Sequence, residues 1–183
     1  MRTPLMAANW KMHKGPEEAV EFFDRFVDAI GDVDGREVLI CPPFVDLYVM
    51  GRKLRDLGAD APFRLGAQNM HPAEQGAYTG EISAPMLQAV HCDYVIVGHS
   101  ERRHVFGEDD EFINQKVKAA RHFDLIPILC VGEMEEQRDA GRAEEVVTAQ
   151  LRQGLADVDL GEPNELVIAY EPVWAMGTGL TVT

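Results

Sequence analysis

Glu171 is a candidate general base because it ends an apolar segment and precedes a proline. The segment LVIAYEP covers 166–172. Pro172 biases the residue before it toward an extended backbone, which fixes the direction in which the carboxylate leaves the chain. A partly desolvated carboxylate in this place is suited to remove a proton from carbon. A single glutamate here is equally compatible with a capping or salt-bridged role at the end of a strand.

His99 is a candidate proton shuttle at the end of a second apolar segment. It stands in VGHSER, and a helix is expected to begin close after it. Backbone N–H groups of that helix could point at the imidazole and favour its neutral form. A neutral imidazole donates a hydrogen bond to a carbonyl oxygen and passes a proton between neighbouring oxygens. The alternative is an ordinary strand-end histidine whose polar atoms are satisfied locally.

Lys11 is a candidate anion-binding residue, since it follows Asn9 and Trp10 at the end of the first apolar segment. A cation in this place could hold an anionic substrate and stabilise negative charge on an oxygen. Glu101, in SERR, could hold the ammonium in position. The spacing of Glu101 from the neighbouring arginines also suits a structural ion pair, and a lone lysine is most often solvated.

Six short segments rich in Val, Leu and Ile predict the strands that position these side chains. They are apolar on both faces, which is typical of a parallel sheet covered by helices. Amphipathic patterns between them predict helices. The predicted strands are 5–10, 37–42, 63–69, 94–100, 125–132 and 166–172, and the main helical patterns follow Pro16, precede Gly58, and cover 84–90, 112–120 and 147–155.

The alternation of strands and helices leaves two α/β architectures, a doubly wound open sheet and a (β/α) barrel. Both place their functional groups beyond the carboxyl ends of the strands. The candidate residues all follow strands, as do Gln68, Asn69 and Glu133. This shared position predicts a single site.

Composition predicts one globular domain over 1–183, with 46% hydrophobic and 26% charged residues. The formal net charge of -14 argues against a nucleic-acid or anionic-membrane partner, but it is compatible with a small phosphate ester. Three cysteines without CxxC spacing predict neither a disulfide framework nor a metal site. No signal peptide is recognisable, so we expect a cytoplasmic protein.

The glycines around Thr178 predict a hinged lid after Trp174, because glycine accommodates large changes in φ and ψ. A plain turn that leads into a helix is the alternative. The predicted lid comprises Pro172, Val173, Trp174, Ala175, Met176, Gly177, Thr178 and Gly179.

Together these stretches closely resemble the triosephosphate isomerase family over essentially the whole chain. The resemblance is carried by NWKMH at 9–13, GAQNM at 66–70, GAYTGEIS at 76–83, VGHSERRHVFGE at 97–108, CVGE at 130–133 and AYEPVWAMGTG at 169–179. It implies a TIM (β/α)8 barrel that interconverts dihydroxyacetone phosphate and glyceraldehyde 3-phosphate in glycolysis and gluconeogenesis. It further implies that no metal or organic cofactor takes part.

The resemblance also implies a role for each candidate residue. Glu171 corresponds to the catalytic base, and His99 corresponds to the neutral imidazole that moves protons between the two oxygens of the enediol(ate). Lys11 corresponds to the electrostatic anchor of the substrate. Asn9 is its polar companion, and Glu101 is the partner of the lysine.

Further implications concern the lid and the subunit contact. Gly177 joins Asn9 and Lys11 among the substrate-binding residues, and Trp174 changes partner between Tyr170 and Glu133 as the lid closes. Thr79, at the tip of the loop 69–84, enters a neighbouring subunit beside its catalytic lysine. The resemblance therefore implies a homodimer; the alternative for this loop is a long solvated insertion.

A barrel of this family needs about 250 residues. We therefore expect about six of the eight βα units here, with open edges at the first and sixth strands and little isomerase activity from residues 1–183 alone. Three interpretations remain: a shortened chain of a working isomerase, a non-enzymatic complementation fragment, and an open-sheet phosphate-binding module. A strand order with a switch point would favour the third.

Overall fold

Six parallel strands form one curved sheet in which neighbours in the sequence are neighbours in space. The computed structural model describes residues 3–31, 33, 35–58, 60–162 and 164–175. The strand order is β1-β2-β3-β4-β5-β6, without a switch point. The strands are β1 (Leu5–Asn9), β2 (Glu37–Cys41), β3 (Phe63–Ala67), β4 (Tyr94–Val97), β5 (Ile126–Val131) and β6 (Val167–Tyr170).

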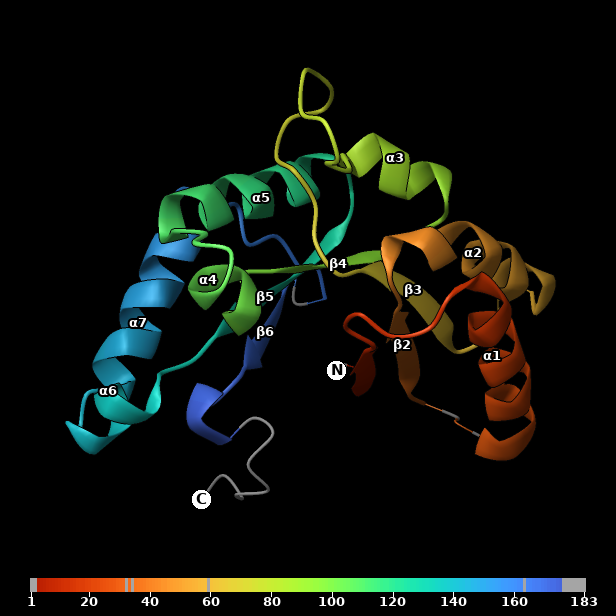
Figure 1. The fold of residues 1–183 in the computed structure, drawn as a ribbon, viewed down its shortest axis with the longest axis horizontal. Coiled ribbons are helices and arrows are strands. Elements are labelled where there is room, and N and C mark those ends of the chain that lie inside the picture. Colours follow the sequence, from red (N-terminus) through yellow and green to blue (C-terminus); the bar gives the residue numbers. More distant parts are fainter. Residues whose placement is uncertain (1–2, 32, 34, 59, 163, 176–183) are drawn as a thin grey trace.

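The helices follow one another along the convex side of the sheet, so the described chain is a partial barrel (Figure 1). Such an arrangement follows when each strand is linked to a parallel neighbour by a helical crossover. The helices are α1 (Pro16–Ile30), α2 (Leu47–Asp56), α3 (Ala84–Ala89), α4 (Ser100–His104), α5 (Asp110–His122), α6 (Glu135–Asp139) and α7 (Ala143–Gly154), with short 3₁₀ turns η1 (Phe44–Asp46) and η2 (Val173–Ala175).

The bounds of α1 illustrate how the sequence defines these elements. Pro16 occupies the first turn, where its missing N–H costs nothing, and Gly31 follows the helix with φ of 66°. Ala19 and Phe23 are fully buried on the face that packs against the sheet. The helical pattern read from the sequence after Pro16 is confirmed.

Two apolar layers lie on opposite faces of the strands because successive side chains of a strand alternate. The larger cluster joins strand residues such as Val95 and Leu129 to helix residues such as Phe23 and Ile113, so it is the layer between sheet and helices. The smaller cluster contains no helix residue and lines the concave face: Leu39, Cys41, Tyr94, Ile96, Ile128 and Cys130.

β1 and β6 differ from the other strands in burial. Each has one neighbouring strand among the described residues. Met6 is 60% exposed and Tyr170 is 47% exposed, whereas β4 is buried throughout. Burial on both faces, as read from the apolar segments, therefore holds for the inner strands and is wrong for these two.

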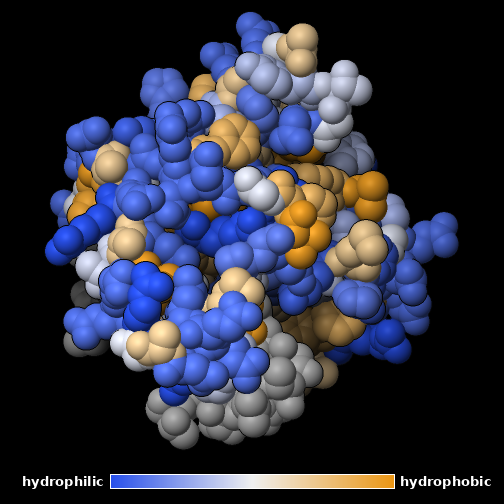
Figure 2. All heavy atoms as spheres, turned by 60° about the vertical axis from the view of Figure 1, so that its left-hand side comes forward, coloured by the Kyte–Doolittle hydropathy of each residue, from blue (hydrophilic) through white to orange (hydrophobic). Residues whose placement is uncertain are grey.

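The outward surfaces of the helices are mostly hydrophilic. Figure 2 brings the side of α5, α6 and α7 forward and displays hydrophobic residues there in small separate groups. Among the described residues, none of the helices is both long enough and apolar enough to cross a bilayer.

Candidate active site

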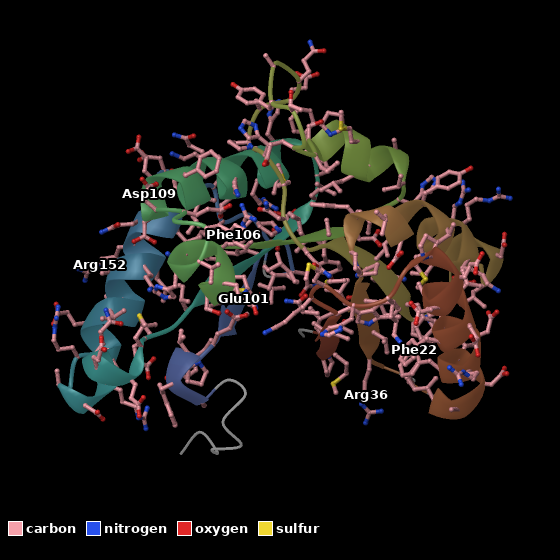
Figure 3. The ribbon with its side chains drawn as sticks, in the orientation of Figure 1. Phe22, Arg36, Glu101, Phe106, Asp109 and Arg152 are labelled. Carbon is pink, nitrogen blue, oxygen red and sulfur yellow. The ribbon has the colours of Figure 1, made fainter. Side chains whose placement is uncertain are left out.

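The candidate residues from β1, the β4–α4 turn and the end of β6 meet around the first residues of α4. Figure 3 displays Glu101 extending from α4 toward the middle of the molecule, well separated from Arg36, which lies just before the amino end of β2. Two large open cavities, of about 800 and about 710 Å³, lie at the amino ends of the strands, and none of the candidate catalytic residues lines them. The candidate catalytic residues and these two cavities therefore lie at opposite ends of the sheet.

Lys11 has a left-handed backbone with φ of 51°, which is strained for a residue with a side chain. Asn9 Oδ1 accepts a hydrogen bond of 2.9 Å from the Lys11 N–H. Gln68 Nε2 donates to the carbonyl oxygens of Lys11, at 2.8 Å, and Cys41, at 2.9 Å. Contacts from β1, β2 and the segment after β3 thus hold the lysine backbone in place.

The Lys11 ammonium forms an ion pair with Glu101, with 2.8 Å between Nζ and Oε1. The hydrogen bond from Lys11 holds the pKa of the Glu101 carboxyl below its usual value. Both side chains are nearly half exposed, so the pair contributes little to stability. Its effect is to fix the place of the ammonium.

The His99 side chain is 7% exposed and caps the first turn of α4. Its Nδ1 accepts a hydrogen bond of 3.1 Å from the Glu101 N–H. Because a nitrogen that accepts a hydrogen bond carries no proton, the neutral ring has its proton on Nε2. This nitrogen lies on the side of Glu171.

The Glu171 carboxylate lies between the His99 ring and the start of α4. Its Oε1 is 3.3 Å from His99 Nε2, and its Oε2 accepts a hydrogen bond of 3.2 Å from the Ser100 N–H. The Glu171 N–H donates to the Val131 carbonyl at 2.8 Å, which continues the β5–β6 pairing by one residue. The side chain is 19% exposed, so it is partly desolvated but accessible.

This arrangement combines a carboxylate, an imidazole with its proton on the near nitrogen, and an ammonium. A carboxylate that is close to a neutral hydrogen-bond donor can remove a proton from carbon while the donor stabilises the oxygen that gains charge. A family model described as triosephosphate isomerase matches residues 4–183. The chain belongs to the triosephosphate isomerase family.

Several relatives match over nearly all of the chain. The triosephosphate isomerase of Roseiflexus sp. (strain RS-1) is 54% identical over 183 residues, which are 100% of this chain and 70% of that protein. The triosephosphate isomerase of Chloroflexus aurantiacus is 51% identical, and 72% of its length is covered. That of Aquifex aeolicus is 50% identical over 179 residues, or 98% of this chain and 70% of the relative.

Membership of the triosephosphate isomerase family confirms the resemblance read from the motifs. The sequential strand order agrees with a partial barrel of about six βα units. The switch point that would favour the open-sheet phosphate-binding module is absent from the described strands. The matches support a barrel-type isomerase chain that spans about 70% of the length of its relatives.

The beginning of the predicted lid is held by Glu133, which is fully buried. Trp174 Nε1 donates to Glu133 Oε1 at 2.9 Å, and the Tyr170 hydroxyl lies 3.0 Å from both carboxylate oxygens. Arg138 stacks over the Trp174 ring at 4.2 Å and bonds Glu133 at 3.4 Å. Both partners implied for Trp174, Tyr170 and Glu133, are thus adjacent to it in one cluster.

Burial alone would raise the pKa of Glu133. Hydrogen bonds from its own backbone N–H, from Trp174, Tyr170 and Arg138 outweigh that effect and hold the pKa below its usual value. The carboxylate is therefore charged in this cluster. Of the predicted lid, Pro172, Val173, Trp174 and Ala175 are described, whereas Met176, Gly177, Thr178 and Gly179 lie outside the described residues.

The loop after β3 projects from the body of the molecule beside α3 and α5 (Figure 1). His71 closes its base, since the His71 N–H donates to the Ile82 carbonyl at 2.8 Å and the imidazole packs on Tyr78 with 4.0 Å between ring centroids. Thr79, which the loop carries, is exposed.

Three contributors to the site are not predicted from the sequence. Gln68 is expected only as a strand-end polar residue, but its amide donates to the carbonyls of Lys11 and Cys41. The Ser100 N–H bonds the Glu171 carboxylate, and Gly132 packs against the Glu171 backbone. Within the described ranges, no group of three or more His, Cys, Asp or Glu side chains is placed to hold a metal ion.

Proposed function

We propose that the native gene product interconverts dihydroxyacetone phosphate and glyceraldehyde 3-phosphate through an enediol(ate), with Glu171 as the base. The observation that carries the proposal is the approach of His99 Nε2 to within 3.3 Å of Glu171 Oε1, beside the Lys11–Glu101 ion pair. These groups come from three different strand ends. Their convergence supports a common reaction centre.

In the forward reaction, the Glu171 carboxylate removes a proton from the carbon next to the ketone. The electron pair of that C–H bond forms the enediolate double bond, and the carbonyl oxygen gains the negative charge. His99 Nε2 transfers its proton to this oxygen, and the same nitrogen then takes the hydroxyl proton from the neighbouring oxygen, so the ring ends neutral. The protonated Glu171 gives its proton to the former carbonyl carbon, which yields the aldose.

Lys11 and Asn9 are proposed to hold the substrate, and Gly177 to contact it from the lid. The Lys11 ammonium would stabilise the negative charge that develops on the enediolate oxygen. Glu101 positions that ammonium. Residues 172–179 would close over the substrate and exclude water, which protects the enediolate from side reactions.

We also propose that the chain forms a homodimer through the loop that carries Thr79. Exposed apolar side chains follow four consecutive strands on the carboxyl side of the sheet, which supports a contact surface there. They are Met12 after β1, Phe44, Val45 and Tyr48 after β2, Tyr78 after β3, and Val105 and Phe106 after β4. Sedimentation should give a dimer mass, and Thr79→Arg should shift it toward the monomer.

Residues 1–183 are proposed to form a single barrel-type domain in a cytoplasmic protein. The larger apolar cluster contains buried residues of β2, β3, β4 and β5, which supports one domain. Three buried free cysteines support a reducing compartment.

The proposed reaction is tested by Glu171→Gln in the native gene product. Loss of the base should lower kcat by roughly 10²–10⁴-fold while circular dichroism remains native. Glu135→Gln is the matched control, because Glu135 is exposed on α6 and should leave kcat unchanged. Near-normal turnover of the Glu171→Gln variant would remove the proposed role.

A further inference from the structure

Arg103 links the carboxyl ends of β4 and β5. Its Nε donates to the Gly98 carbonyl at 2.7 Å, and its Nη2 donates to the Cys130 carbonyl at 3.2 Å. Its Nη1 bonds Asp110 Oδ1 at 2.5 Å, and the side chain is 9% exposed. One guanidinium group therefore joins the end of β4, β5 and the start of α5. In Figure 3 the start of α5, marked by Asp109, lies above α4.

The two carbonyls lie just beyond the point where the β4–β5 pairing ends. The last registered pair is Val97 with Leu129, and Gly98 and Cys130 are the next residues of the two strands. Gly98 has φ of 70°, which takes the chain out of the strand. The guanidinium therefore replaces the backbone pairing that the turn has interrupted.

A side chain at Gly98 would crowd this link. A Cβ at Gly98 would lie 3.0 Å from Arg103 Nη2 and 3.3 Å from the Cys130 carbonyl oxygen. The positive φ disfavours a side chain independently of this contact. The close approach and the link by Arg103 are thus parts of one local structure.

Both linked strand ends determine where the proposed reacting groups lie. Gly98 directly precedes His99, and the His99 carbonyl accepts a hydrogen bond of 3.1 Å from the Arg103 N–H. Cys130 precedes Val131, whose carbonyl accepts from the Glu171 N–H. β5 therefore stands between β4, which carries the imidazole, and β6, which carries the carboxylate.

We propose that Arg103 is a positioning residue that sets the separation between the His99 imidazole and the Glu171 carboxylate. This inference rests on the proposed roles of these two residues. Arg103 donates to backbone carbonyls at both strand ends and acts through the backbone that carries each side chain. Asp110 holds the guanidinium in the plane that reaches both carbonyls.

A lysine cannot reproduce this link, although it keeps the charge. The planar guanidinium presents donors in a fixed fork, whereas an ammonium is a compact charge on a flexible stem. Arg103→Lys would leave at least one of the two buried carbonyls without a donor. The ends of β4 and β5 could then move relative to one another.

Steady-state kinetics of the native gene product separate positioning from a structural role. Arg103→Lys should lower kcat by about tenfold or more and leave KM within about twofold, because small misplacements of reacting groups strongly reduce turnover. Both proteins are assayed at a temperature where circular dichroism shows them fully folded.

Arg121→Lys is the matched control. Arg121 also bonds one backbone carbonyl and one carboxylate, both of Glu165, but it lies before the amino end of β5, far from the site along the strand. It should leave kcat and KM within about twofold. If Arg103→Lys fails to fold, Asp110→Asn replaces it, because this change loosens the guanidinium without removing its donors to the carbonyls.

A folded Arg103→Lys or Asp110→Asn variant with unchanged kcat would overturn the proposal, as would an effect confined to KM. Glu171→Gln in the same assay keeps the two proposals distinguishable. If that variant is inactive and the Arg103 variants are normal, the positioning role alone fails. If Glu171→Gln is active, the proposed reaction itself fails.

Discussion

Gly132→Ala should reduce turnover strongly through a contact between two strand ends. A Cβ at Gly132 would lie 1.8 Å from the Glu171 carbonyl oxygen and 2.6 Å from its carbonyl carbon. Gly132 does not have a positive φ, so alanine is disfavoured by this contact and not by its own backbone. Ordinary contact begins at 3.4 Å, so one of the two backbones must move by about 1.6 Å.

The displacement should fall on Glu171, because Gly132 is clamped. Gln150, on α7, accepts a hydrogen bond of 2.8 Å from the Gly132 N–H and donates one of 3.2 Å to the Gly132 carbonyl. A misplacement of about 1 Å in a reacting group costs on the order of 10²-fold in rate. We therefore expect kcat to fall by about 10²-fold or more, which corresponds to about 2.7 kcal/mol in the barrier.

The assay is steady-state isomerisation in both directions, with thermal unfolding followed in parallel. Gly15→Ala is the control, because a Cβ at Gly15 would meet nothing within 4 Å. It should leave kcat unchanged. A Gly132→Ala protein with kcat within about threefold of the parent and a native unfolding temperature would refute the claim that the close approach of the two backbones sets the position of the base.

Three further changes test the electrostatics of the chain. Asp46 is fully buried, and neither of its carboxylate oxygens has a hydrogen-bond partner among the described residues. Burial raises its pKa, so Asp46→Asn should increase the free energy of unfolding at pH 7 by about 1 kcal/mol. That gain should shrink as the pH falls toward 4 in urea titrations, since a protonated Asp46 carries no charge to bury. The hydrogen bond from Lys11 lowers the pKa of Glu101, so any stability that this pair contributes is lost only as the pH falls below the usual carboxyl range. Glu101→Gln should release the Lys11 ammonium and thereby lower kcat/KM at pH 7 by roughly tenfold. Glu133→Gln should cost about 1–3 kcal/mol in chemical denaturation and change the fluorescence of Trp174 in a variant that keeps only this tryptophan.

The strands were predictable because buried strands require short segments rich in Val, Leu and Ile, which are recognisable in the sequence. All six apolar segments are confirmed as strands, although several end earlier than the apolar run. β4 ends at Val97 because Gly98 adopts a positive φ. The amino-acid sequence alone does not predict this backbone conformation. The short helix α6 was missed, since five residues are too few for a 3.6-residue period to be recognised.

The candidate site was predictable to the extent that its residues lie at strand ends. Glu171, His99 and Lys11 carry titratable groups in positions where a parallel sheet gathers its functional side chains. Gly132 and Arg103 were not predictable in this way, because their contacts join strands that are distant in sequence. A glycine after an apolar run and an arginine in a charged segment are common in places without such contacts.

The site is organised by three consecutive residues at the start of α4. His99 supplies the imidazole, the Ser100 N–H bonds the carboxylate from β6, and Glu101 bonds both the ammonium from β1 and the His99 ring. The separations among the three proposed reacting groups are therefore set within one helical turn and do not depend on the packing of the intervening strands. The position of α4 relative to the sheet therefore matters for all three groups, and Arg103 holds it by joining the helix to β5. A change that rotates this turn would displace all three groups together. A change at β2 would displace the ammonium alone, because the Gln68 amide bonds both the Cys41 and the Lys11 carbonyls.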